Sequence, residues 1–152
     1  MSPRSVGFNV QGVRVAVHRV TGEIMTLQSV HAADIGRLIN PMQCRGQLDG
    51  AIAMGFDWAL YEKMVYNDQG EMLNPALRDY RIPAFADVPR SEIYFADTYD
   101  KVGPLGAKAQ GECAINCIAP AIANAVADAT GLRFPDLPLT PDRLFERLGS
   151  RS

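Results

Sequence analysis

Glycine and proline residues divide this chain into short segments along its whole length. The sequence holds 13 Gly and 10 Pro among 152 residues, and they are spread out and not gathered in one linker. Glycine permits turns and close backbone contacts, whereas proline interrupts helices and sheet ladders. The sequence therefore predicts many turns between short elements, in a single segment that covers residues 1–152.

Composition and charge argue against several function classes. Hydrophobic residues make up 47% and charged residues 21%, as in ordinary globular proteins. The net charge of −2 lacks the basic excess of a nucleic-acid binder, and no apolar run reaches membrane-spanning length. No apolar stretch follows the first residues, and three Cys fit a reducing compartment. We therefore expect a cytoplasmic protein with no nucleic-acid or membrane partner.

The first elements are predicted to be two paired strands within residues 6–31. Val13, Val15 and Val17 alternate with other residues, which is the period-two pattern of a strand with one buried face. Gly22 lies in the turn that follows and can supply a positive φ. The second strand is expected to return from residue 24 onward.

The next element is predicted to be a helix over residues 40–63, capped by Asn40. Its interior holds Gly46, Gly50 and Gly55, each of which costs about 1 kcal/mol relative to Ala in a helix. Small residues four apart form flat stripes that another backbone or a ligand can approach closely. The pattern predicts a helix that is buried among other elements.

Residues 64–98 have no clear helical period. An Asn-Asp-Gln-Gly turn at residues 67–70 predicts a hairpin between two short extended segments. Two prolines and mixed charges over residues 74–88 indicate a long ordered loop. Alternation over residues 92–97 predicts a strand.

Two helices are expected in the last third of the chain. Gly131 is a natural terminator of the first, although Pro120 predicts a kink or a late start. The second spans residues 142–148. The residues expected to face inward are Ile115, Ile118, Ile122, Val126, Leu144, Phe145 and Leu148. The predicted fold class is α+β: an N-terminal antiparallel strand ribbon, a buried Gly-rich helix, an ordered loop, a Glu-bearing Gly loop and two C-terminal helices.

The loop of residues 101–112 is the first candidate for chemistry. Its glycines, Gly103, Gly106 and Gly111, could turn successive backbone N–H groups toward one point and so cradle an anion. The spacing is not that of a nucleotide-binding P-loop. Glu112 stands at the entry to the following helix, whose dipole favours an ionised carboxylate that could serve as a base. The alternative is a Gly-rich turn with an acidic residue in the first turn.

Gln47 is the second candidate. A Gln between small residues on a buried helix should seek a partner, because leaving it unpaired costs ~1–3 kcal/mol. It could bind a ligand or donate to the backbone of a neighbouring loop.

The cysteines give little support for a metal site. Cys113 and Cys117 share one helical face, but Cys44 is distant and no matching Cys pair is present. We expect all three to be small buried hydrophobic residues.

Four segments, taken together, resemble one enzyme family. Residues 103–112, Gly-Pro-Leu-Gly-Ala-Lys-Ala-Gln-Gly-Glu, resemble the segment with the catalytic glutamate in molybdenum hydroxylases, the xanthine dehydrogenase and aldehyde oxidase family. Residues 40–55 are similar to that family's Gly- and Gln-bearing helix beside the pterin cofactor. Residues 80–85 resemble its intervening loop, and residues 137–143 its closing helix. The ordered matches span residues 6–148.

The resemblance implies a C-terminal part of the family's molybdopterin-binding large subunit. The complete enzyme would hold molybdenum-molybdopterin and would hydroxylate an aldehyde or N-heterocyclic substrate with water as the oxygen source. Electrons would pass to iron–sulfur clusters and FAD on partner subunits. The implied partners are the remainder of the molybdopterin-binding subunit, the iron–sulfur subunit, the FAD subunit and a small-molecule substrate, in an oligomer. We expect the isolated chain to be inactive.

The resemblance also implies site residues. Glu112 would be the catalytic base, and no residue of this chain would ligate the metal. The implied cofactor-binding residues are Gly46, Gln47, Lys108, Ala109, Gln110 and Gly111. The chain departs from the family pattern at Cys113, where many relatives carry Pro, and at Gln110, where a small apolar residue is common.

Two other functions stay open at this point. The chain could be a non-catalytic remnant or structural docking module for another large-subunit fragment. It could also be a free-standing domain that binds an anion in the Gly103–Gly111 loop.

Overall fold

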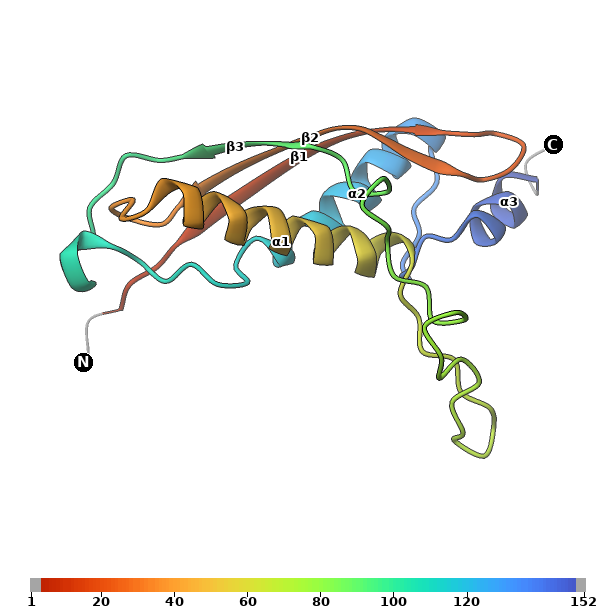
Figure 1. The fold of residues 1–152 in the computed structure, drawn as a ribbon. Helices are drawn as coiled ribbons and strands as arrows, with labels where there is room; N and C mark the ends of the chain where they lie inside the picture. The colour runs from red at the N-terminus through yellow and green to blue at the C-terminus, as the bar shows by residue number, and fades with distance from the viewer. Residues whose placement is uncertain (1–3, 150–152) are drawn as a thin grey trace.

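A three-stranded sheet forms one layer of the molecule, and two helices form the other (Figure 1). The computed structural model describes residues 4–149. The strands are β1 (Phe8–Val17), β2 (Ile24–Asp34) and β3 (Ser91–Phe95), in the order β1-β2-β3. Helices α1 (Pro41–Leu60) and α2 (Ile115–Thr130) lie on the same face of this sheet. The α+β class predicted from the sequence is confirmed.

The predicted strand pair is an antiparallel hairpin with one buried face. Val13, Val15 and Val17 pack against the core, and their outward neighbours are exposed. Gly22 adopts φ +74° in the turn, as expected. A Cβ added at Gly22 would lie 2.2 Å from the carbonyl oxygen of Pro141, so glycine also permits the turn to pack closely on the C-terminal helix.

The third strand pairs with β2 in parallel register, from Ser29 opposite Ser91 to Ala33 opposite Phe95. A parallel pair requires a long crossover connection. Here the connection consists of α1 and residues 61–90, and it carries the chain across the core face of the sheet and back (Figure 1).

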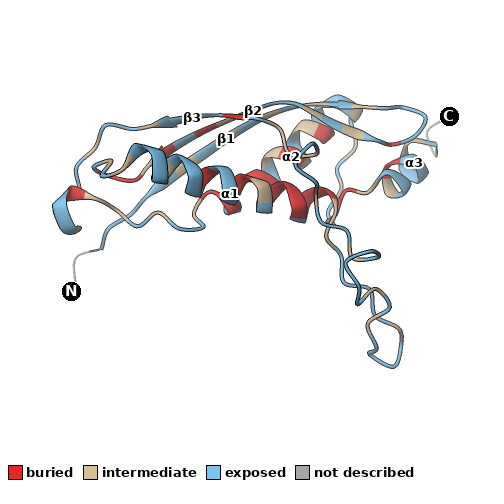
Figure 2. Ribbon diagram, viewed as in Figure 1, coloured by how far each residue is buried: buried red, intermediate tan, exposed pale blue. Residues whose placement is uncertain are grey.

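Helix α1 begins where the sequence predicts, because the Asn40 side chain accepts a hydrogen bond from the backbone amide of Gln43 over 3.1 Å. Its burial is uneven, however. Gly55 packs on Ile118 of α2, whereas a Cβ added at Gly46 or Gly50 would meet nothing within 4 Å. The prediction of a helix buried among other elements is therefore wrong for the first half, which keeps an open face (Figure 2).

Residues 62–90, here called the arm, run outward from the end of α1 and return to β3 (Figure 1). The predicted hairpin within the arm is present in a short form: Tyr66 forms an antiparallel bridge with Met72, and the amides of Asn67 and Leu73 donate to the carbonyls of Glu71 and Val65. At its base, the Tyr80 hydroxyl donates to Glu62 over 2.8 Å. The large hydrophobic side chains exposed on the arm are Met64, Val65, Tyr66, Leu73, Leu77, Ile82 and Phe85.

The core lies between the helices and the sheet (Figure 2). All the inward-facing residues predicted for α2 are buried, Pro120 lies inside the helix, and Gly131 ends it in the left-handed conformation. In α3 (Pro141–Gly149), Leu144 is buried and Leu148 packs on the core. Phe145 is exposed, contrary to prediction, because it lies about 100° around the helix from Leu144. No helix within residues 4–149 is long and apolar enough to cross a membrane.

Candidate cofactor site

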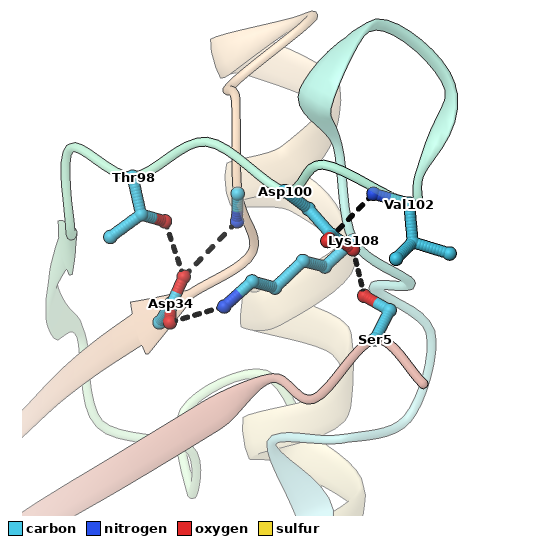
Figure 3. A network of polar contacts seen from close by, with 7 residues as sticks. Ser5, Asp34, Thr98, Asp100, Val102 and Lys108 are labelled. Carbon is cyan, nitrogen blue, oxygen red and sulfur yellow. Dashed lines mark hydrogen bonds and ion pairs between the residues drawn. The ribbon is translucent and has the colours of Figure 1, made fainter. Parts of the chain in front are cut away.

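A nearly buried ion pair fixes the loop before Glu112 to the end of β2 (Figure 3). The Lys108 ammonium lies 2.5 Å from Oδ2 of Asp34, and the two side chains are 13% and 17% exposed. Oδ1 of Asp34 accepts from the Thr98 hydroxyl over 2.5 Å and from the Gly36 amide over 3.2 Å. The hydrogen bond from Lys108 is the main reason that the pKa of Asp34 falls to about 2, and the bonds from Thr98 and Gly36 lower it further.

The backbone is fixed at the same place. The Lys108 amide donates to the carbonyl of Ile35 over 2.7 Å, and Gly36 forms an antiparallel bridge with Ala107. A Cβ added at Gly36 would lie 2.4 Å from the carbonyl oxygen of Gly106, so only glycine fits this contact. Two chain segments more than 65 residues apart in the sequence thus meet backbone to backbone.

The glycine loop itself is not the anion cradle that the sequence suggested. The Gly106 amide donates to Gly103, the Ala107 amide to Pro104 and the Lys108 amide to Ile35. The first two of these bonds belong to a short 3-10 helix, η1 (Pro104–Gly106). Because these amides are occupied internally, the hypothesis of an anion nest over the Gly103–Gly111 loop is wrong for its first half.

The free backbone donors lie further along the chain. Among residues 4–149, the amides of residues 109–113 have no acceptor, either in the backbone or in a side chain. These residues are exposed or half-buried. A run of five unpaired amides immediately before a helix is suited to binding the oxygen and nitrogen acceptors of a polar ligand.

Two side-chain amides connect this run to the open half of α1. Nε2 of Gln47 donates to the carbonyl of Gly111 over 3.2 Å, and Nε2 of Gln110 donates to the carbonyl of Cys44 over 2.7 Å. Gln47 thus makes the bond to a loop backbone that was one of its two expected partners, and the loop is the one that carries Glu112. Gln47 is exposed, not buried as the sequence suggested.

Glu112 lies in the turn before α2, and its carbonyl accepts from the amide of Ile115 over 3.1 Å. Its carboxylate is exposed and has no partner among the described residues. The bond from Gln47 to the preceding carbonyl brings Gln47 and Glu112 to the same surface. This surface consists of the open half of α1, with Gly46 and Gln47, and the segment from Ala109 to Glu112.

Lys108, which the resemblance associates with the cofactor, has its ammonium bonded to Asp34 at the end of β2 (Figure 3). Sequence reasoning missed Asp34 and Thr98, because a carboxylate after an apolar strand gives no signal of a partner 74 residues later. It also missed Asp57 on α1, whose side chain is buried with Oδ1 unpaired. Burial, followed by the nearby charge of Glu62, raises the pKa of Asp57 to about 7.

Histidine, cysteine and carboxylate side chains are scattered over the described part of the chain. Within residues 4–149, no three His, Cys, Asp or Glu side chains are grouped so that they could hold a metal ion. The thiols of Cys44, Cys113 and Cys117 are free and half-buried. His31 is buried between Gln11 and Asn9, with ring-nitrogen contacts of 2.7 and 3.0 Å, and burial lowers its pKa.

The comparisons with known proteins identify the family of the chain. A family model described as "Molybdopterin cofactor-binding domain" matches residues 2–89, which is more than half of the chain and includes Gln47. The chain belongs to the molybdopterin cofactor-binding family. The resemblance inferred from the four sequence segments is thereby confirmed at the level of the family.

Two curated relatives of this family member come from Escherichia coli. The aldehyde oxidoreductase molybdenum-binding subunit PaoC of strain K12 is 38% identical over 90% of this chain and 19% of its own length. The xanthine dehydrogenase molybdenum-binding subunit of O157:H7 is 40% identical over 88% of this chain and 17% of its own length. The chain therefore spans less than a fifth of the length of these relatives.

Solved structures agree with the family and the fold. Quinoline 2-oxidoreductase from Pseudomonas putida 86 superposes with a TM-score of 0.86 at 32% identity, over 91% of this chain and 18% of that one. The aldehyde oxidoreductase from Desulfovibrio gigas superposes with a TM-score of 0.85 at 29% identity, over 94% of this chain and 15% of that one.

The residues at the candidate surface fit a molybdopterin cofactor. A pterin presents ring nitrogens, a carbonyl and a phosphate, all of which accept hydrogen bonds. Five unpaired amides at residues 109–113 can donate to such groups, and the carbonyl of the Gln47 side chain is free to accept one. The open space over Gly46 and Gly50 allows a close approach to the helix.

Proposed function

We propose that this chain is part of a molybdenum hydroxylase that hydroxylates an aldehyde or N-heterocyclic substrate with water as the oxygen source. The family supports the cofactor class, and the names of the relatives support the two substrate classes. Because the chain spans less than a fifth of its relatives' length, the activity would belong to an assembly that includes the remaining four fifths.

The main support for the proposal is one hydrogen bond between α1 and the loop before Glu112. The side-chain amide of Gln47 donates to the carbonyl of Gly111, the residue immediately before Glu112. This bond joins the helix expected at the pterin to the loop expected to hold the base, although the two are 64 residues apart. The unpaired amides around Glu112 lie on the same surface.

In this function Glu112 is the catalytic base. The bound molybdenum cofactor supplies the redox chemistry of the reaction. The Glu112 carboxylate removes the proton from the water-derived oxygen that is transferred to the substrate, and positioned bases of this kind contribute about 10²–10⁴ in rate. An exposed carboxylate with no internal partner is free to take up this position.

The cofactor is held by neighbouring groups of the chain. Gln47 offers its free side-chain carbonyl, and Gly46 leaves room beside it. Ala109, Gln110 and Gly111 offer their backbone amides. The Gln110 side chain is already bonded to Cys44, so Gln110 contributes through its backbone.

The partners proposed for the assembly are the remainder of the molybdopterin-binding subunit, an iron–sulfur subunit and an FAD subunit that accept the electrons. Exposed apolar side chains support further protein contacts. The outer face of the sheet exposes Phe8, Val10, Met25 and Leu27, and Phe85 on the arm is fully exposed. Apolar surfaces of this kind usually mark interfaces.

The test is Glu112→Gln in the assembled enzyme. We expect molybdenum and pterin content to stay unchanged and turnover of an aromatic aldehyde with a dye acceptor to fall by at least about 10². Glu146→Gln, at an exposed position on α3, is the matched control and should leave turnover unchanged. Wild-type turnover in Glu112→Gln would refute the base and favour a non-catalytic docking module.

A further inference from the structure

The segment that carries Glu112 is rigidly fixed on one side only. Up to Lys108, backbone bonds to Ile35 and Arg37 and the bridge to Gly36 hold the loop against the end of β2. Beyond Lys108, two side-chain hydrogen bonds, from Gln47 and Gln110, connect the segment to α1. Lys108 is therefore the last residue before the proposed base that a backbone hydrogen bond holds to the end of β2.

We propose that Asp34 and Lys108 are positioning residues for Glu112: their ion pair sets where residues 109–112 leave the core, and so where the base lies relative to Gln47. The inference rests on the proposed function, because the position of Glu112 matters to turnover only if Glu112 is the base. It deepens that function by assigning Lys108 to the loop and not to the cofactor.

The ion pair of Asp34 and Lys108 is largely buried and has further partners, unlike an ion pair on the protein surface. Both side chains are at least four-fifths buried, and the Lys108 ammonium also lies 5.9 Å from the centre of the Phe8 ring. Asp34 is held from two other directions, by Thr98 and by the Gly36 amide. A carboxylate fixed by three donors has one orientation, so the lysine that reaches it is fixed as well.

Residues 100–106, which precede Lys108, are held by a second set of hydrogen bonds at Asp100. Asp100 accepts hydrogen bonds from the Ser5 hydroxyl and, over 3.1 Å, from the amide of Val102 (Figure 3). The Asp100 amide also donates to the carbonyl of Gly106. We expect these bonds to keep residues 100–106 folded when the ion pair is removed, so the loss of Lys108 should act on the segment that follows it.

The experiment compares Lys108→Met, Asp34→Asn and Lys108→Arg in the assembled enzyme. Met keeps the length of the side chain and removes the charge, Asn keeps an acceptor for Thr98 and Gly36, and Arg keeps the ion pair. Lys101→Met is the matched control, since Lys101 is exposed on the same loop and forms no ion pair with any residue that the structure describes. The measurements are kcat, KM, molybdenum content and the alkylation rate of Cys113 relative to that of Cys117.

We expect Lys108→Met and Asp34→Asn to lower kcat by about 10², because a displacement of about 1 Å can cost that much, with KM and molybdenum content retained. The half-buried thiol of Cys113, next to Glu112, should become more accessible and be alkylated several-fold faster. Cys117, on α2, should be unaffected. Lys108→Arg should restore most of kcat, and Lys101→Met should match the wild type.

Three results would overturn the inference. The first is wild-type kcat and Cys113 alkylation in both charge-removing variants. The second is a loss of kcat that accompanies a loss of molybdenum and that Lys108→Arg fails to restore. The third is wild-type turnover in Glu112→Gln, which refutes the assignment of Glu112 as the base and this inference together. Inactive Glu112→Gln with active Lys108→Met refutes the positioning role alone.

Discussion

Gln47 and Gly111 are joined by a hydrogen bond of 3.2 Å from a helix side chain to a loop carbonyl. The bond crosses from the open half of α1 to the residue before Glu112, and it is accompanied by the bond from Gln110 to Cys44 in the opposite direction. Two side-chain amides thus connect the segment of the proposed base to α1, the proposed pterin helix. A substitution in either segment should therefore affect the position of the other.

Gln47→Ala should weaken cofactor retention without unfolding the chain. The substitution removes one exposed hydrogen bond, whose net contribution to stability is about 0.5–1.5 kcal/mol. It also removes the side-chain carbonyl proposed to face the cofactor. We expect lower molybdenum content and lower turnover in the assembled enzyme, measured by elemental analysis and steady-state kinetics.

Gln43→Ala is the matched control, because Gln43 is exposed one turn earlier and its side chain makes no hydrogen bond among the described residues. If both variants retain molybdenum equally well, Gln47 has no role at the cofactor.

Asp34→Asn should destabilise the protein in a pH-dependent way. The folded pKa of about 2 lies below the ordinary value of 3.8, so the charged carboxylate stabilises the fold above pH 3.8 and this contribution is lost as the pH falls toward 2. The difference corresponds to about 2 kcal/mol at pH 7. Urea unfolding of wild type and variant at pH 7 and pH 3 measures it. A gap between the two proteins that is equally large at pH 3 would contradict the linkage.

The elements with local signals were predictable from sequence. The valine alternation of β1, the cap at Asn40 and the apolar spacing of α2 each depend on residues within a few positions of one another. For the same reason the order of loops and helices was predicted correctly, and the segments resembling the family could be recognised.

Features that depend on distant partners were not predictable. The parallel pairing of β3 with β2 joins residues about 62 positions apart, and a strand pattern carries no information about its partner. The spacing of Gly46, Gly50 and Gly55 is similar, yet Gly55 packs on Ile118 and the other two are open. The ion pair of Lys108 was missed because a single Lys in a glycine loop is equally consistent with a phosphate or a carboxylate partner.

Asp57→Asn should remove a pH-dependent destabilisation. Asp57 is 8% exposed and its pKa is raised to about 7, so the folded state keeps a proton that the unfolded state releases near pH 3.8. The free energy of unfolding should therefore fall by about 2–4 kcal/mol as the pH rises from about 4 to 7. Above pH 7 it should level off. Unfolding free energies measured from pH 4 to pH 8 should show this slope in the wild type and lose it in the variant.

Glu62→Gln provides the control for Asp57. Glu62 is the second cause of the raised pKa, after burial, so its neutralisation should shift the slope to lower pH without abolishing it. A slope that is unchanged in Asp57→Asn would assign the titration to another group.

Gly55→Ala and Gly50→Ala should change stability in opposite directions, although both sit inside the same helix. A Cβ at Gly55 would lie 2.7–3.0 Å from three side-chain atoms of Ile118, and such overpacking costs about 1–3 kcal/mol. A Cβ at Gly50 meets nothing within 4 Å, so the variant should gain about 1 kcal/mol from helix propensity. Chemical denaturation of the two variants measures both signs. Because the open face at Gly50 is proposed to lie near the cofactor, Gly50→Ala should also bind less molybdenum in the assembled enzyme. Equal stabilisation of Gly50→Ala and Gly55→Ala would mean that α1 and α2 do not pack at Gly55 as described.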